Sequence, residues 1–396
     1  MSIIISLDSC TVPKPTEIID LCKNMQPNKS CGLWDIGNEL KPSDLFCYLY
    51  SKFGPPNGMQ NFLRNDSSDN LIHWDWTLVH ANGLIIFLGL NLRTEIQLIG
   101  NWDFPNCDKQ QLVDFIKRDF LQYEKQMKEI RNKKFEDWDM IINPYKMMKD
   151  SINQLKKELD KLALNPLAEA VSNPQTMHDS QRFKALWDET TAKYNKGIGL
   201  SMAIRSMTPV LAESFINLLF FCLCRQDIKK NKRLYESAIR ANIDIKVQSL
   251  HINCQGFLKE IQWSSKECGS YNTIVNERND FLHGNVKVDK LKFSEIFFIG
   301  KVPIFKSYKD LWQRSIGVSI DASGFDKISD DLTTINLFVE YVLSCLEPKI
   351  KADIEHLINS PHIGVNKKNG QVAVLLPARI VDFRFTRVIE KNEKLP

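Results

Sequence analysis

Residues 271–284 read YNTIVNERNDFLHG, a helical pattern that ends in glycine. Tyr271, Ile274 and Phe281 are spaced by three and seven residues, which is the spacing of one buried face of a helix. Gly284 suits the left-handed backbone conformation that ends many helices. The stretch therefore predicts a helix packed in a core, with His283 in its last turn.

Arg278 lies on the same apolar face, four residues after Ile274 and three before Phe281. A guanidinium keeps its charge at any physiological pH, so burying it without a partner is costly. We expect an anion beside it, either an internal carboxylate such as Glu213 or a phosphate of a ligand. Asn279 precedes His283 by four residues, which places the amide and the imidazole on one side of the helix.

An arginine, an asparagine and a histidine without metal ligands suit the cleavage of RNA by its own 2′-hydroxyl. That reaction needs a proton acceptor, a proton donor and a cation for the charge that grows on the phosphate oxygens. Imidazole titrates near neutral pH and can fill the first two roles, and guanidinium matches phosphate oxygens in a bidentate manner. Arg278, Asn279 and His283 are thus the predicted catalytic residues, with no metal and no cofactor.

The segment from Arg278 to Gly284 resembles the Arg-x4–6-His motif of the HEPN superfamily, whose catalytic members carry a polar residue directly after the arginine. The resemblance covers roughly residues 181–358, and Leu211–Asn217 resembles an early helix of the same bundles less specifically. It implies a metal-independent endoribonuclease that acts as a homodimer, with two motifs meeting in one composite site. Many relatives are toxins or antiviral-defence effectors that cut tRNA or other RNA.

Two other interpretations stay open at this point. In the first, Arg278 pairs with a buried acid such as Glu213 and His283 only caps the helix. In the second, the bundle is a non-catalytic module for dimerisation or protein interaction. Exposure of His283 in a cleft that faces a second copy would favour catalysis, whereas a buried and internally paired histidine would favour the alternatives.

The composition fits a folded protein with balanced charge. The 396 residues suggest two or three units, and 52 basic against 48 acidic side chains neither require nor exclude a nucleic-acid partner. The ten cysteines form no Cys-x-x-Cys pair, so the usual zinc spacing is absent. The N-terminus lacks the pattern of a signal peptide, and the apolar stretch 210–224 is too short and polar to span a bilayer. We expect a cytoplasmic protein without a membrane partner.

The predicted fold class is α+β, mainly a HEPN-like helical bundle. Residues 1–107 form a β-containing domain, in which strand 71–80, a type I′ turn at Asn82-Gly83 and a return strand from Leu84 make a hairpin. Residues 108–165 form a long helical connector, and 181–360 form the bundle with helices near 181–200, 208–226, 231–262, 266–283 and 327–358. Residues 361–396 form a short β tail. The N-terminal domain is expected to sense a trigger molecule or protein.

Other candidate residues have simpler interpretations. His73 and Asp75 share a strand face and could hold a metal ion, although a solvated polar face is the expected arrangement. Trp74 and Trp76 could stack on bases, but packing in a core is favoured. The basic run 229–233 could touch phosphates, but such runs are usually solvated.

Overall fold

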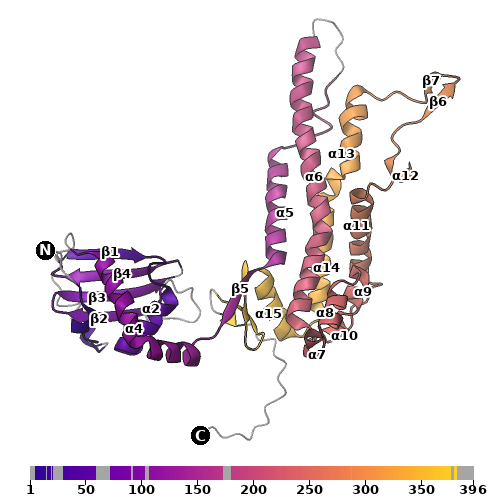
Figure 1. Ribbon diagram of the computed structural model, residues 1–396. Coiled ribbons are helices and arrows are strands. Elements are labelled where there is room, and N and C mark those ends of the chain that lie inside the picture. The colour runs from indigo at the N-terminus through magenta and orange to yellow at the C-terminus, as the bar shows by residue number, and fades with distance from the viewer. Residues whose placement is uncertain are drawn as a thin grey trace. The chain divides into compact units, whose positions relative to one another are not determined.

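The computed structural model contains two compact units, each with its own apolar core (Figure 1). Unit 1 is built mainly from residues 1–139 and unit 2 mainly from residues 140–365. Helices and small sheets occur together, which confirms the α+β class. The described residues are 5–14, 16–18, 20, 30–58, 72–90, 92–102, 107–172, 180–286, 288–375 and 379–380.

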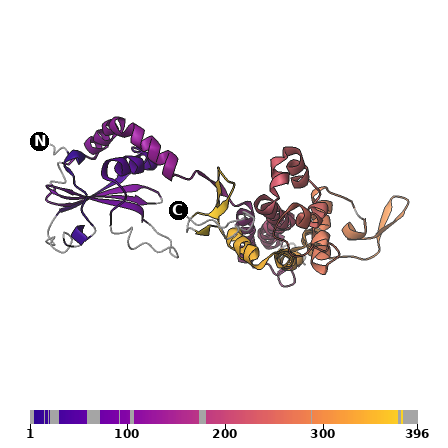
Figure 2. The same ribbon diagram turned by 90° about the horizontal axis from the view of Figure 1, so that it is seen from below.

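Unit 1 is an antiparallel sheet with helices packed on one face, as Figure 2 shows. Its strand order is β1-β4-β3-β2. Trp76 and Phe87 lie opposite each other in the sheet and are fully buried beneath the helices. The elements are β1 (Ser30–Ile36), α2 (Pro42–Phe53), β2 (Ile72–His80), β3 (Gly83–Leu90), β4 (Thr94–Gly100) and α4 (Lys109–Lys134), after a short 3-10 turn at Leu7–Ser9.

The β2–β3 hairpin is confirmed, but two expectations about it are wrong. Its two-residue loop is Ala81-Asn82, and Gly83 with φ 139° already pairs with His80. Asn82 does not have positive φ, so the loop is not the predicted type I′ turn. Asp75 is 2% exposed and not on a solvated face.

The segment 108–165 is not one helical connector. The side chains of Leu112, Val113 and Ile116 on α4 belong to the core of unit 1. In contrast, Ile152 and Leu159 on α5 (Pro144–Lys161) belong to the core of unit 2. The apolar stripes of α4 and α5 are therefore the buried faces of two different units.

Unit 2 is organised around α6 (Ser180–Leu223), a single helix of 44 residues. Two separate helices were expected near 181–200 and 208–226, but the buried face continues past Pro209 without a break. Gly197 allows close packing, because a Cβ there would come within 2.4 Å of Leu164 Cδ1. Among the described helices only α6 is apolar and long enough to cross a membrane, and 61% of its apolar window is buried, as in the core helix of a soluble protein.

Helix α11 (Lys266–Leu282) matches its expected range, but two other predicted helices of unit 2 are divided into shorter ones. The stretch 231–262 contains three short helices, and 327–358 is two helices separated before Pro348. The elements are α7 (Gln226–Lys230), α8 (Lys232–Ile239), α9 (Ile243–Gln248), α10 (Leu250–Asn253), α11 (Lys266–Leu282), α12 (Val288–Leu291), a π-helical turn (Gln313–Gly317), α13 (Val318–Ser323), a 3-10 turn (Phe325–Lys327), α14 (Ile328–Ser344) and α15 (Pro348–Ile358).

Short strands complete the chain. A hairpin of β6 (Ile296–Ile299) and β7 (Val302–Phe305) follows α12, in a region for which no strand was predicted. In the expected C-terminal β tail, β8 (His362–Asn366) pairs with β9 (Val372–Val374) in antiparallel fashion, and β10 covers Arg379–Ile380. Strand β5 (Trp138–Ile142) lies between α4 and α5 in the sequence. Residues 381–396 lie outside the described residues.

Candidate active site

Helix α11 carries the predicted motif and is held on its apolar side. Ser265 caps its N-terminus by accepting a hydrogen bond from the Cys268 N–H at 3.3 Å. Tyr271 and Ile274 are buried in the core of unit 2, and the Tyr271 ring stacks on Phe338 of α14 at 4.3 Å between centroids. The position of α11 is therefore fixed by packing against α6 and α14.

The C-terminal end of α11 has the predicted geometry. His283 is the C-cap and Gly284 has φ +61°. The Gly284 N–H donates to the Phe281 carbonyl at 3.3 Å, and the Asn285 N–H donates to the Asp280 carbonyl at 2.9 Å. These two bonds define a Schellman motif, which satisfies the last carbonyls of the helix. A Cβ at Gly284 would contact nothing within 4 Å, so the backbone angle is what favours glycine here.

Arg278 is half-buried and has no carboxylate partner among the described residues. Its Nη1 donates to the side-chain oxygen of the neighbouring Asn279 at 2.9 Å. Its Nε is buried without a hydrogen-bond partner in the described part of the chain. Glu213, the acid considered as its partner, instead pairs with Lys246 at 3.6 Å. The charge of Arg278 is therefore not neutralised by any carboxylate of the described residues.

The buried phenol of Tyr271 feels the charge of Arg278 but does not balance it. Burial raises the pKa of Tyr271, the negative charge of Glu213 raises it further, and the positive charge of Arg278 lowers it. The phenol of Tyr271 therefore stays neutral and gives Arg278 no counter-charge.

His283 is exposed at the end of α11. Its backbone N–H donates to the Asn279 carbonyl at 3.0 Å, but its imidazole makes no hydrogen bond or ion pair with any described residue. Asn279 is half-buried and orients the guanidinium of Arg278. The structure thus joins Arg278 and Asn279 directly, while the imidazole of His283 is open to solvent one helical turn after Asn279.

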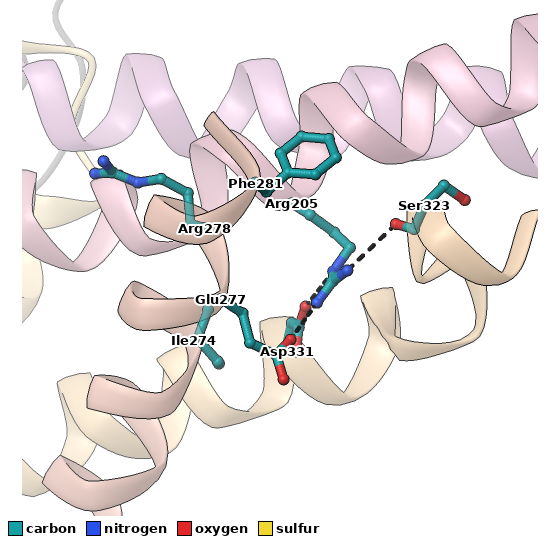
Figure 3. Close-up of a pocket in the computed structure, with 7 residues that line it drawn as sticks. All are labelled: Arg205, Ile274, Glu277, Arg278, Phe281, Ser323 and Asp331. Atoms are coloured by element: carbon teal, nitrogen blue, oxygen red, sulfur yellow. Dashed lines mark hydrogen bonds and ion pairs between the residues drawn. The ribbon is translucent and has the colours of Figure 1, made fainter. Parts of the chain in front are cut away.

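The sequence interpretation missed a partly buried ion cluster next to the motif. In this Arg205 cluster, Arg205 of α6 binds Glu277 of α11 at 2.6 Å and Asp331 of α14 at 2.9 Å. Arg205 also donates to the Ser323 carbonyl at 3.3 Å, and Lys327 lies 3.6 Å from Glu277. Figure 3 shows Arg205 directed toward the two carboxylates, whereas Arg278 points away from them. The cluster ties three helices together and fixes the residue that precedes Arg278.

The pocket beside these residues is too small for a nucleotide. Its volume of about 10 Å³ is roughly that needed for one water molecule. Any polymeric substrate would have to bind at the surface around the end of α11. The lining residues are Arg205, Ile274, Glu277, Arg278, Phe281, Ser323 and Asp331.

Trp74, Trp76 and Lys229 take structural roles. Trp74 and Trp76 pack edge-on against each other and against Phe46. Lys229 donates to the Phe221 carbonyl at 2.5 Å. Burial raises the pKa of the Cys222 thiol to about 12, as in a core cysteine.

The described residues contain no group of three or more His, Cys, Asp or Glu side chains that could hold a metal ion. Comparisons with protein-family models, with curated proteins and with solved structures found no match.

Proposed function

We propose that the chain is a metal-independent endoribonuclease of HEPN type that acts on RNA, tRNA included, as a homodimer. The observation that carries the proposal is the half-buried Arg278, which lacks an internal carboxylate within the described residues and lies close in sequence to the exposed His283. Holding a guanidinium partly desolvated is unfavourable unless an anion arrives. A phosphate diester supplies that anion.

In the proposed reaction a neutral imidazole takes the proton from the 2′-hydroxyl. The 2′-oxygen then attacks the adjacent phosphorus, the bond to the 5′-oxygen breaks, and an imidazolium gives a proton to the leaving 5′-oxygen. Arg278 stabilises the charge on the non-bridging oxygens, and Asn279 orients its guanidinium. The products are a 2′,3′-cyclic phosphate and a 5′-hydroxyl.

A second copy of the chain would supply the second acid–base group that the reaction uses. One motif supplies a single histidine, while the reaction uses both a base and an acid. Two copies related by a two-fold axis near the C-terminal end of α11 would supply two histidines and two arginines to one site. The small pocket of the single chain and the exposure of His283 support this arrangement.

The biological setting follows from the same resemblance. We propose a cytoplasmic toxin or antiviral-defence effector, with unit 1 as the sensor for a trigger molecule or protein. The separate core of unit 1 supports an independent role for it. The rival function is a non-catalytic dimerisation module, which the hydrogen bond between Arg278 and Asn279 favours because it partly satisfies the guanidinium internally.

The test is incubation of the purified protein with total RNA and with tRNA in excess EDTA. We expect cleavage to persist, with products that end in a 2′,3′-cyclic or 3′ phosphate, because the 2′-oxygen is the nucleophile and no metal takes part. His283→Ala, prepared in the same way, is the control for contaminating ribonuclease. Strict dependence on Mg²⁺, or products with 3′-hydroxyl ends, would exclude the mechanism.

A further inference from the structure

The β6–β7 hairpin is apolar on both faces. Its two strands read IFFI and VPIF, so every residue in them is apolar, and all except Phe305 are exposed. Phe297 and Phe298, which point to opposite faces because they are consecutive in a strand, are 57% and 65% exposed. A two-stranded hairpin is only marginally stable in water, and exposed apolar patches of this kind mark interaction surfaces. Both faces of this hairpin are therefore candidate interaction surfaces.

The apolar surface continues from the hairpin back to the candidate site. Leu282, Val286, Val288, Leu291 and Phe293 are all more than half exposed along the segment that joins α11 to the hairpin. Figures 1 and 2 show the hairpin standing away from the helices of unit 2. We call residues 282–311 the arm.

We propose that the arm packs on a second copy of this chain and holds the two α11 ends together. The choice of a second copy as the partner rests on the proposed function. The arm starts at the Arg278–His283 motif, and a two-fold axis would bring that motif next to the same motif of the second copy. Over both faces, the exposed apolar area of the arm is on the order of 1,000 Å², compared with the roughly 800 Å² that each partner buries in a stable interface. The end of one helix could not supply that area alone.

The charges at the two ends of the hairpin favour a protein partner over a membrane. Lys301 lies at the tip between the strands, where insertion into lipid would bury its ammonium group at high cost. At the base, Glu295 pairs with Lys306 at 2.5 Å and also with Lys292. Strands of four residues reach only about 13 Å, well short of the roughly 30 Å of a bilayer core.

The experiment compares the full-length wild-type chain with the double variant Phe297→Ser/Phe298→Asp. We expect wild type at twice 45.8 kDa by light scattering and the variant mainly at 45.8 kDa. The dimer of the variant should be at least about 30-fold weaker, the size of one interface hot spot. The circular dichroism spectrum of the variant should match that of wild type, because both side chains are exposed in the single chain, and its Tm should fall only by the stability that the dimer adds. Leu121→Asp, at a 78% exposed site on α4, is the matched control and should remain dimeric.

Several results would overturn the arm as a dimer contact. These are a monomeric wild type, a variant that stays dimeric, or a loss of dimer in Leu121→Asp as well. Flotation of the wild type, but not the variant, with anionic phospholipid vesicles would assign the arm to a membrane. Weaker binding of RNA by a variant that is still dimeric would assign it to substrate.

Failure of the arm and failure of the proposed function are distinguishable. If the variant loses the dimer but wild type cleaves no RNA, the arm is a dimer contact and the proposed ribonuclease function is wrong. If wild type cleaves RNA and the variant keeps both the dimer mass and the activity, the ribonuclease function is supported and the arm is not the dimer contact. If both stand, the activity of the variant should recover as its concentration rises, because mass action restores the dimer.

Discussion

Arg205 and Arg278 are two partly buried arginines in one helical unit, and their surroundings differ sharply. Arg205 meets two carboxylates and a backbone carbonyl from three elements. Arg278 meets only the amide of its neighbour Asn279, and its Nε is buried without a partner among the described residues. The difference separates a cation that holds the fold together from one that is free to bind an anion from outside.

The two arginines are also mechanically connected. Glu277, which Arg205 holds at 2.6 Å, directly precedes Arg278 on α11. Because consecutive residues of a helix point about 100° apart, fixing Glu277 toward the interior turns Arg278 away from the cluster. The Arg205 cluster is thus a positioning device for the candidate site, and its loss should affect stability first and activity only through α11.

The largest expected effect is on stability, in Arg205→Ala. Asp331, which is 8% exposed, and Glu277 would lose their main cationic partner. Stranding a buried charge in this way costs on the order of 3–5 kcal/mol, and we expect Tm to fall by on the order of 10 °C. Thermal melts followed by circular dichroism measure this. Arg225→Ala removes an exposed ion pair with Asp227 and should leave Tm unchanged; equal Tm values for both variants would contradict the structural role of Arg205.

The next effect is on the rate of RNA cleavage, in Arg278→Ala and His283→Ala. Each should reduce the rate by at least about 100-fold, the scale of a lost acid–base or charge-stabilising group. Tm should stay equal or rise slightly, because neither group has an ionic partner to strand within the described residues. Rates and melts should be measured on the same preparations. Variants that melt early yet keep their activity per folded molecule would show that Arg278 belongs with Arg205 as a structural residue.

The sequence could predict the candidate helix because its signals are local. The apolar stripe with Ile274 and the glycine at 284 are read within a few residues, and helix α11 ends as expected. The Arg205 cluster joins residues more than 70 positions apart, so the partners could not be paired from sequence. One clue was present: Asp331 lies on the buried stripe of Ile328 and Ile335, as Arg278 lies on that of α11.

Errors in the fold came from competition between local signals and packing. Separate helices were predicted near 181–200 and 208–226, yet burial of a continuous face keeps α6 intact through Pro209. The hairpin was missed because its strands lack the polar–apolar alternation of a half-buried sheet: all of their side chains are apolar. That same property now makes the hairpin the strongest candidate for a contact surface.

The smallest expected effect comes from an ion pair farther along α6, and it tests whether burial sets the size of these effects. Glu169 accepts hydrogen bonds from Lys193 and Tyr194 of α6, both at 2.6 Å, but the side chains of Glu169 and Lys193 are each 32% exposed. The hydrogen bonds from Lys193 and then Tyr194 lower the pKa of Glu169 to about 2.

The lowered pKa makes the contribution of Glu169 depend on pH. A carboxyl with a lowered folded-state pKa stabilises the protein above its ordinary pKa near 4.5, and this contribution is lost as pH falls toward 2. Glu169→Gln should therefore lower stability at pH 7 by no more than about 1 kcal/mol, and the difference from wild type should shrink below pH 4.5. Thermal melts of wild type and Glu169→Gln from pH 7 to pH 3 measure this difference in stability.

A loss of stability at pH 7 as large as that of Arg205→Ala would contradict the prediction. It would mean that the number of partners, and not their burial, decides how much an ion pair contributes in this helix.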